Sequence, residues 1–218
     1  MRIFSLLLFS CWMLINPLMA QQNSPDAKDL LNRLAEKGKS IQQVTFDFSY
    51  RIQNEELDEV QSGKASVSGA KYRIKLGENT LVCDGEYRYT ILGMDATELQ
   101  INCLESEDDA NSFLDPKTLL NPKIEDFNYQ LLANETHKDK AVKVVKLKPK
   151  TTNPSYDYLE LLIDEDKMEV VMARIFTEDG TKYFFEISQL NTAPALQQTL
   201  FQIDEGTFDD VIDLRDDC

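Results

Sequence analysis

The chain has few of the residues from which metal centres and nucleophilic active sites are built. Among 218 residues there is a single histidine, His137, and the four cysteines include no CxxC pair, the spacing typical of zinc sites. The GxSxG turn of serine hydrolases is also absent. His137 lies in the polar stretch NETHKDK, which indicates an exposed loop. We therefore expect no catalytic residue, no metal and no cofactor, and we expect that the protein is not an enzyme. An exported hydrolase is the least supported alternative, because no nucleophile has a base beside it.

Positive charge is also scarce. The chain has 23 Lys and Arg residues against 38 Asp and Glu, a formal charge of −15. Such a surface repels phosphate backbones and anionic head groups at long range, so we expect no nucleic-acid partner. The acidic runs at 105–109 and 209–217 lack the glycine-centred spacing of a calcium loop. They are interpreted as solvated charge that keeps the protein soluble.

The first twenty residues have the features of a targeting segment. Arg2 precedes an apolar run that ends at Ala20, and the run is too short for a membrane span. We predict a signal peptide over residues 1–20, cleaved near Ala20, and a single domain over 21–218. An alternative stays open, because LFSC, ending at Cys11, resembles a bacterial lipidation box. Cleavage there would leave the apolar WMLINPLM exposed behind the lipid.

Three cysteines remain after cleavage near Ala20, namely Cys83, Cys103 and Cys218. A bridge between Cys83 and Cys103 is one alternative. Turns at Asp84–Gly85 and at 93–96 would place the two on strands separated by a third strand. We expect that spacing to be too large for a direct bond.

One helix is marked at both ends. In SPDAKDLLNRLAEKG, Ser24 is a cap, Pro25 takes the first helical position and Gly38 follows the last turn. Three leucines share one stripe between these signals, so an amphipathic helix is predicted. One or two further short helices are predicted within 105–127, where Asp115 and Pro116 form a start signal.

Most of the remaining sequence alternates with a period of two, which is typical of strands buried on one side. In QVTFDFSYRI the apolar residues share one face, and the same alternation returns in YRIKL, NTLVCDGEYRYTI and LQINC. We expect these strands to turn their apolar faces to a common side. Further strand signals lie in FNYQLLA, AVKVVKLK, YDYLELLI, EVVMARIF and KYFFEISQL, separated by hairpin turns that include NETHKDK. The chain is predicted to end in a strand and an acidic tail.

About ten such strands cannot stay flat without exposing an apolar face and two edges. The sequence therefore predicts an α+β, mainly β fold with a strongly curved antiparallel sheet. Two short helices supply too little volume to fill it, so an apolar hollow is expected. The alternative is that the aromatic residues simply pack one another as core. These residues are Phe46, Phe48, Tyr87, Tyr89, Tyr183 and Phe185.

The order of the motifs resembles the LolA family of periplasmic outer-membrane lipoprotein carriers. The matching segments are a helix, the FDFSY strand, YRI at 72–74, LVCDGEYRY at 81–89 and a closing VIDL at 211–214. The resemblance covers nearly all of residues 21–218. It departs from the family where a basic residue and a proline are expected before YRI, because residues 68–70 are Ser, Gly and Ala. This leaves the mechanism of ligand release open.

The resemblance implies an incomplete β-barrel closed by short helices that act as a lid. It also implies a periplasmic, monomeric carrier that binds lipoprotein acyl chains in an apolar cavity and ferries them towards the outer membrane. The partners would be outer-membrane lipoproteins and an inner-membrane lipoprotein-releasing transporter, with an outer-membrane acceptor as a further candidate. The predicted acyl-chain site comprises Phe46, Phe48, Tyr72, Ile74, Tyr87, Tyr89, Leu99 and Ile101 on the concave face, with Leu119 and Leu120 on the lid.

A second hypothesis uses the same fold differently. The chain would be an exported sensor or protein-interaction module whose acidic surface binds a partner and whose own side chains fill the core. An apolar cavity large enough for alkyl chains distinguishes the carrier from this module.

Overall fold

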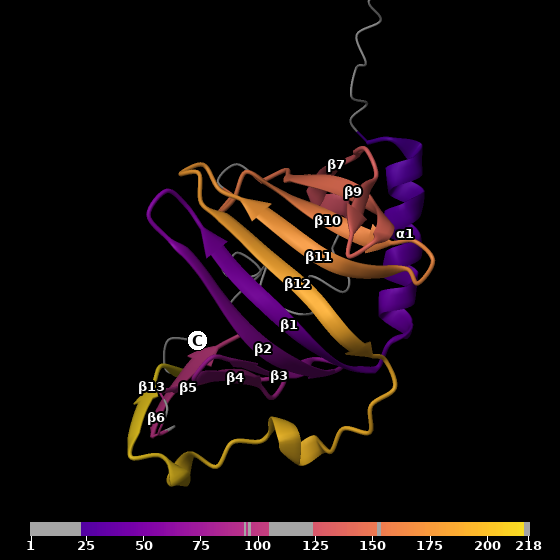
Figure 1. Ribbon diagram of the computed structural model, residues 1–218. Helices are drawn as coiled ribbons and strands as arrows, with labels where there is room; N and C mark the ends of the chain where they lie inside the picture. Colours follow the sequence, from indigo (N-terminus) through magenta and orange to yellow (C-terminus); the bar gives the residue numbers. More distant parts are fainter. Residues whose placement is uncertain (1–22, 94, 96, 105–123, 152–153, 216–218) are drawn as a thin grey trace, which may run out of the picture.

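The chain folds into one large curved sheet that stays open (Figure 1). The computed structural model describes residues 23–93, 95, 97–104, 124–151 and 154–215. Within these residues there are 13 strands and one α-helix. The predicted fold class, mainly β with a curved antiparallel sheet, is confirmed.

The α-helix, α1, covers Pro25–Ser40 and begins as the sequence predicts. The hydroxyl of Ser24 accepts a hydrogen bond from the backbone N–H of Ala27 at 3.2 Å, which satisfies one of the free donors of the first turn. The predicted leucine stripe is buried. The helix continues two residues beyond Gly38, whose carbonyl accepts the N–H of Ile41.

The first half of the sheet is an antiparallel meander in which each strand pairs with the next along the chain. Its strands are β1 (Gln43–Gln53), β2 (Asp58–Ser68), β3 (Lys71–Leu76), β4 (Asn79–Cys83), β5 (Tyr87–Leu92) and β6 (Glu98–Cys103).

The second half joins the first through the pairing of β1 with β12. It comprises the short 3-10 helix η2 (Ile124–Asp126) and the strands β7 (Phe127–Leu131), β8 (Glu135–His137), β9 (Lys140–Pro149), β10 (Tyr158–Asp164), β11 (Glu169–Phe176) and β12 (Lys182–Asn191). Lys138 and Asp139 both have positive φ between β8 and β9, the conformation of a two-residue hairpin turn. The predicted hairpin in NETHKDK is therefore confirmed. The prediction that His137 is exposed is wrong, because β8 packs over the sheet and leaves its side chain only 18% exposed.

The C-terminal segment crosses back to the first half of the sheet (Figure 1). It contains two 3-10 helices, η3 (Gln198–Phe201) and η4 (Glu205–Thr207), and the last strand, β13 (Asp210–Asp213). β13 pairs with β6 in parallel, which confirms the predicted terminal strand. The end of the predicted acidic tail, 216–218, lies outside the described residues.

The sheet has two faces that must be distinguished. We call the face on which α1 packs the inner face and the opposite face the outer face. The inner face carries the largest buried cluster, which joins the α1 leucines to side chains of β1, β2, β3, β4, β7, β9, β10, β11 and β12. Burial of each large apolar side chain contributes about 1.5–3 kcal/mol to folding, so this cluster supplies most of the driving force.

Parts of the sheet are apolar on both faces. In β4 the neighbours Val82 and Cys83 are both fully buried, although they point to opposite sides. The same holds for Leu161 and Leu162 in β10. A run of adjacent buried residues is typical of a strand covered on both faces. Outer-face clusters accordingly lie at both ends of the sheet.

The cysteines follow the predicted separation. β5 lies between β4 and β6, so Cys83 and Cys103 are two strands apart. Cys83 is buried and is not part of a disulfide, whereas Cys103 is disulfide-bonded. The two therefore do not pair with each other.

The described residues lack two kinds of feature. No group of three or more His, Cys, Asp or Glu side chains in this part of the chain could hold a metal ion. No helix among the described residues is long and apolar enough to cross a membrane.

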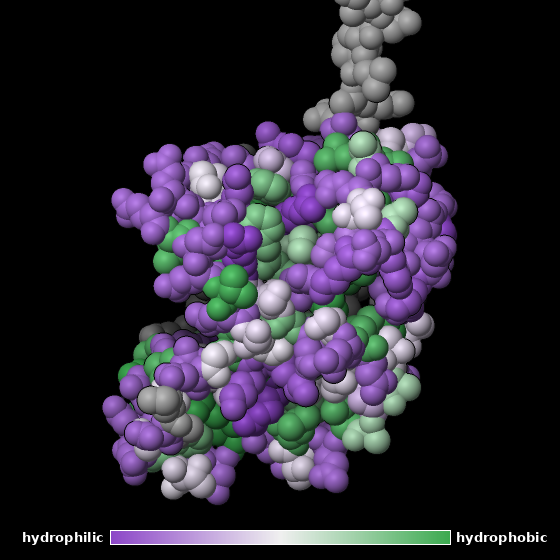
Figure 2. Space-filling view, viewed as in Figure 1, coloured by the Kyte–Doolittle hydropathy of each residue, from purple (hydrophilic) through white to green (hydrophobic). Residues whose placement is uncertain are grey.

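The face shown in Figure 2 is mainly hydrophilic, and its hydrophobic side chains form small separate patches.

Candidate functional site

Four of the eight residues predicted for the concave face lie together on the inner face. Phe46, Phe48, Tyr72 and Ile74 belong to the cluster that includes α1, and each is less than 10% exposed. Phe48 stacks on Phe185 with ring centroids 4.6 Å apart. These aromatic contacts belong to a packed interior.

The other four lie on the outer face. Between β4 and β5, the predicted apolar residues change from the inner to the outer face of the sheet. Cys83, which shares a face with Tyr72, is opposite Arg88 in the register. Tyr89 therefore points to the other side, where it is opposite Val82 and Ile101. The prediction that all these strands turn their apolar residues to one side is wrong. Tyr87, Tyr89, Leu99 and Ile101 lie on the outer face.

The outer-face residues form a cluster of their own. It comprises Val82, Tyr89, Ile91, Leu99 and Ile101, with Tyr87, Ile203 and Phe208 packed against it. Two of these, Ile203 and Phe208, come from the C-terminal segment, which covers this end of the sheet. The alternation of apolar residues in the strands does not predict this cover. The adjacent apolar pair in β4, VC, is the signal that could have revealed it.

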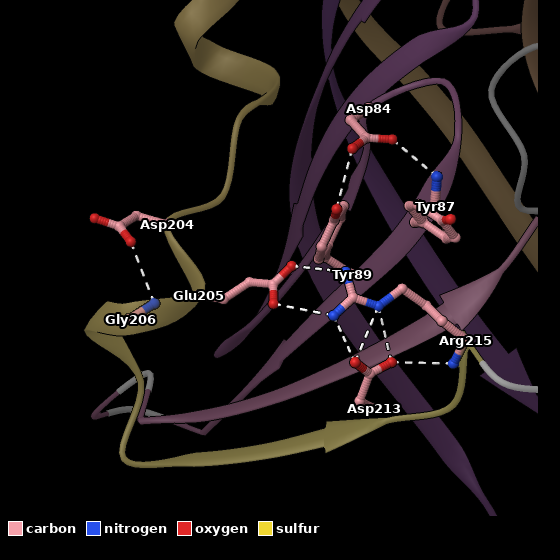
Figure 3. A network of polar contacts seen from close by, with 8 residues as sticks. All are labelled: Asp84, Tyr87, Tyr89, Asp204, Glu205, Gly206, Asp213 and Arg215. Carbon is pink, nitrogen blue, oxygen red and sulfur yellow. Dashed lines mark hydrogen bonds and ion pairs between the residues drawn. The ribbon is translucent and has the colours of Figure 1, made fainter.

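Polar contacts fix the C-terminal segment to β5 and to itself (Figure 3). The guanidinium of Arg215 donates hydrogen bonds to both carboxylate oxygens of Glu205, at 3.0 and 3.1 Å, and to Asp213. It also lies 5.5 Å from the ring centroid of Tyr87. The hydrogen bonds from Arg215 lower the pKa of Asp213, and those to Asp213 and Glu205 raise the pKa of Arg215.

The turn between β4 and β5 is organised by Asp84. One carboxylate oxygen accepts the backbone N–H groups of Glu86 and Tyr87, both at 2.8 Å, and the other accepts the hydroxyl of Tyr89 at 3.1 Å. Figure 3 shows the bonds from Tyr87 and Tyr89. Burial opposes ionisation of Asp84, but these hydrogen bonds outweigh it, and the pKa of Asp84 is lowered. Burial, together with the bond to Asp84, raises the pKa of Tyr89 to about 12.

Leu119 and Leu120, the predicted lid residues, lie outside the described residues. The described helix that covers the inner face is α1. It buries five apolar residues, Ala27, Leu30, Leu31, Leu34 and Ala35.

Two pockets are lined by described residues. A groove of about 490 Å³ lies on the outer face and is lined mainly by polar and charged side chains. A small recess of about 20 Å³ lies between the end of α1 and the start of β11. Neither of the two is an apolar cavity of alkyl-chain size.

Comparison with known proteins finds similar structures but no similar family model or curated sequence. No protein-family model matches the sequence, and no curated protein sequence matches it. Among solved structures, an uncharacterized conserved protein from Thermus thermophilus has a TM-score of 0.56 at 12% identity, covering 86% of this chain and 99% of that one. A LolA superfamily protein from Nitrosomonas europaea has a TM-score of 0.43 at 11% identity, covering 82% and 98%.

A third similar structure is a putative outer membrane lipoprotein-sorting protein domain from Vibrio parahaemolyticus. Its TM-score is 0.47 at 11% identity, and the match covers 81% of this chain and 97% of that one. At 12% identity and a TM-score of 0.56, the similarity to the Thermus thermophilus protein is one of fold alone. The sheet of this chain is curved, open and mainly antiparallel, as the resemblance to the LolA family implies.

Proposed function

We propose that the protein is a non-catalytic binding protein that holds the acyl chains of lipoproteins against the inner face of its sheet. It would carry them through the periplasm towards the outer membrane after cleavage of residues 1–20. The observation that carries this proposal is the extent of the inner apolar face, which runs across nine strands. α1, the described helix on that face, buries five apolar residues. The LolA-like order of the sequence motifs supports the same function.

The energetics favour a reversible carrier. Each methylene exposed to water costs about 0.8 kcal/mol, so one long acyl chain costs on the order of 10 kcal/mol. The rings of Phe46, Phe48 and Tyr72 are buried among the protein's own side chains. A bound acyl chain must displace some of these contacts, and this competition weakens binding enough for release.

The strand register reduces the number of predicted residues that can belong to the proposed acyl-chain site. Phe46, Phe48, Tyr72 and Ile74 are the members of the predicted set that an acyl chain on the inner face can contact. The predicted residues on the outer face pack against the C-terminal segment instead. Leu119 and Leu120 remain proposed lid residues.

Native mass spectrometry of the protein purified from the periplasm tests this function. We expect a co-purified lipoprotein or diacyl lipid that is lost after extraction with detergent. Ile74→Trp, which adds volume on the inner face, should reduce the bound fraction, whereas Val60→Ile at the exposed tip of β2 should not. A folded protein that carries no lipid under these conditions would contradict the proposal.

A protein-interaction module is the second candidate, because the packing of the interior favours it. Neither of the two pockets lined by described residues is an apolar cavity of alkyl-chain size, the feature that distinguishes a carrier from a module. The inner aromatic rings pack on one another, as in the stacks of Phe48 with Phe185 and of Tyr50 with Tyr183 at 6.1 Å. A self-filled core of this kind needs no ligand. The same experiment separates the candidates, since a module would co-purify with a protein partner and without lipid.

A further inference from the structure

The groove on the outer face has the features of a second binding site. It lies between the two covered ends of that face, where β1, β2, β3 and β12 meet the turn that follows β8. Its volume, about 490 Å³, is in the range of small-molecule sites. Its lining consists of Asp47, Phe48, Ser49, Ser62, Gly63, Lys64, Lys75, Gly77, Lys138, Glu186 and Ser188.

Both carboxylates in the groove are already paired with cations. Lys64 Nζ lies 3.3 Å from Asp47 Oδ1 on the next strand. Lys138 forms an ion pair with Glu186, and His137 Nε2 lies 3.2 Å from the same carboxylate oxygen. Glu186 therefore holds Lys138 at the rim of the groove, and neither acid has an uncompensated charge to repel an anion.

Lys75 supplies an excess positive charge. It lies directly opposite Lys64 in the register of β2 and β3, so both side chains project from the same face. Like charges at such positions destabilise a sheet. Lys75 is exposed and makes no ion pair with any described residue. Lys64 and Lys75 are thus neighbouring ammonium groups, and of the two only Lys64 is paired with a carboxylate of the described residues, that of Asp47 on its far side. They form a local site for an anion, although the chain as a whole is strongly acidic.

Hydroxyl groups line the groove beside these lysines. Ser49 and Ser62 are opposite each other in the register of β1 and β2. Ser188 lies opposite Asp47 and donates a hydrogen bond to its backbone carbonyl at 3.2 Å. Hydroxyls both donate and accept, so they can bind the hydroxyls of a polyol.

We propose that this groove binds a small phosphorylated carbohydrate. The phosphate would lie between Lys64 and Lys75, where two charge-assisted hydrogen bonds are available. The sugar hydroxyls would lie over the serines. The site is on the opposite side of the sheet from the proposed acyl-chain site and does not depend on it.

Titration of the chain comprising residues 21–218 with glucose 6-phosphate, followed by NMR and calorimetry, tests the proposal. We expect shifts confined to the amides around Ser49, Ser62 and Lys75, and binding that weakens with added salt. Lys75→Gln should weaken binding at least tenfold. Lys148→Gln is the matched control, because Lys148 is an exposed lysine on β9 outside the groove, and it should leave binding unchanged.

Four results would overturn the proposal. The first is no saturable binding of glucose 6-phosphate to the folded wild type. The second is equal weakening by Lys148→Gln, which would indicate general electrostatics. The third is inorganic phosphate or glucose alone binding as tightly as glucose 6-phosphate. The fourth is Lys75-dependent binding to anionic phospholipid vesicles without binding of glucose 6-phosphate, which would identify a lipid surface as the ligand.

Discussion

The ring of Phe48 lies directly over Gly63 on the neighbouring strand. The two residues are register partners of β1 and β2. A Cβ atom built on Gly63 would lie 2.3 Å from Cζ of Phe48 and 2.6 Å from the backbone oxygen of Lys75. The absence of a side chain at Gly63 therefore leaves room for the ring of Phe48, which stacks on Phe185.

Gly63→Ala should destabilise the protein by about 1–3 kcal/mol, the usual cost of overpacking a tight site. Phe48 could move away from the added methyl, but the backbone oxygen could not move without bending β3. Urea unfolding at pH 7 measures the change. Ser62→Ala on the same strand is the control and should stay within about 0.5 kcal/mol of wild type. Equal stability of Gly63→Ala and wild type would show that the strands are further apart here than the structure has them.

The lowered pKa of Asp84 predicts a dependence of stability on pH. The ionised carboxylate accepts two backbone N–H groups and the Tyr89 hydroxyl. Its contribution is fully present above the ordinary aspartate pKa of about 3.9 and is lost as the pH falls through the lower pKa of the folded state. Asp84→Asn, which keeps one acceptor oxygen but removes the charge, should lose about 1 kcal/mol at pH 7.

Unfolding of wild type and Asp84→Asn across the range from pH 7 to pH 2 provides the measurement. The difference between them should be constant down to about pH 5 and should shrink below the ordinary aspartate pKa. A difference that stays constant to pH 2 would show that the charge of Asp84 is not what stabilises the turn.

The contacts of Arg215 predict that it holds the C-terminal segment in place. Arg215→Gln removes the bonds to Glu205 and Asp213 and should speed amide hydrogen exchange in residues 204–214. Arg33→Gln is the matched control, since Arg33 forms ion pairs with Asp29 and Glu165 at the other end of the molecule. It should leave exchange in this segment unchanged. Hydrogen exchange followed by mass spectrometry checks both, and unaltered exchange in Arg215→Gln would mean that Ile203 and Phe208 suffice to hold the segment.

The strands and the first helix were predictable because their signals are local. Ser24 and Pro25 start α1 as expected, and the alternation in β1 places Phe46 and Phe48 on the buried side. EVVMARIF coincides with β11. In each case the local period or cap agrees with the tertiary packing.

The distribution of the site over two faces was not predictable in the same way. It depends on which residue of β5 is opposite Cys83, and a shift of one position in the turn at Asp84 would have put Tyr89 on the inner face. The sequence of that turn does not specify this register. The cover on the outer face depends on contacts between Tyr87 and Arg215, more than a hundred positions apart, which periodicity cannot reveal.

Site-specific photo-cross-linking can show directly whether lipoprotein acyl chains bind the inner face. The photoreactive residue p-benzoylphenylalanine replaces either Tyr72, on the inner face, or Tyr89, on the outer face, and each variant is irradiated with a purified acylated lipoprotein. Circular dichroism confirms that both variants are folded. We expect a cross-link to the acyl chains from position 72 and none from position 89. A folded variant at position 72 that forms no cross-link, or one that reacts no more than position 89, would contradict the proposed function.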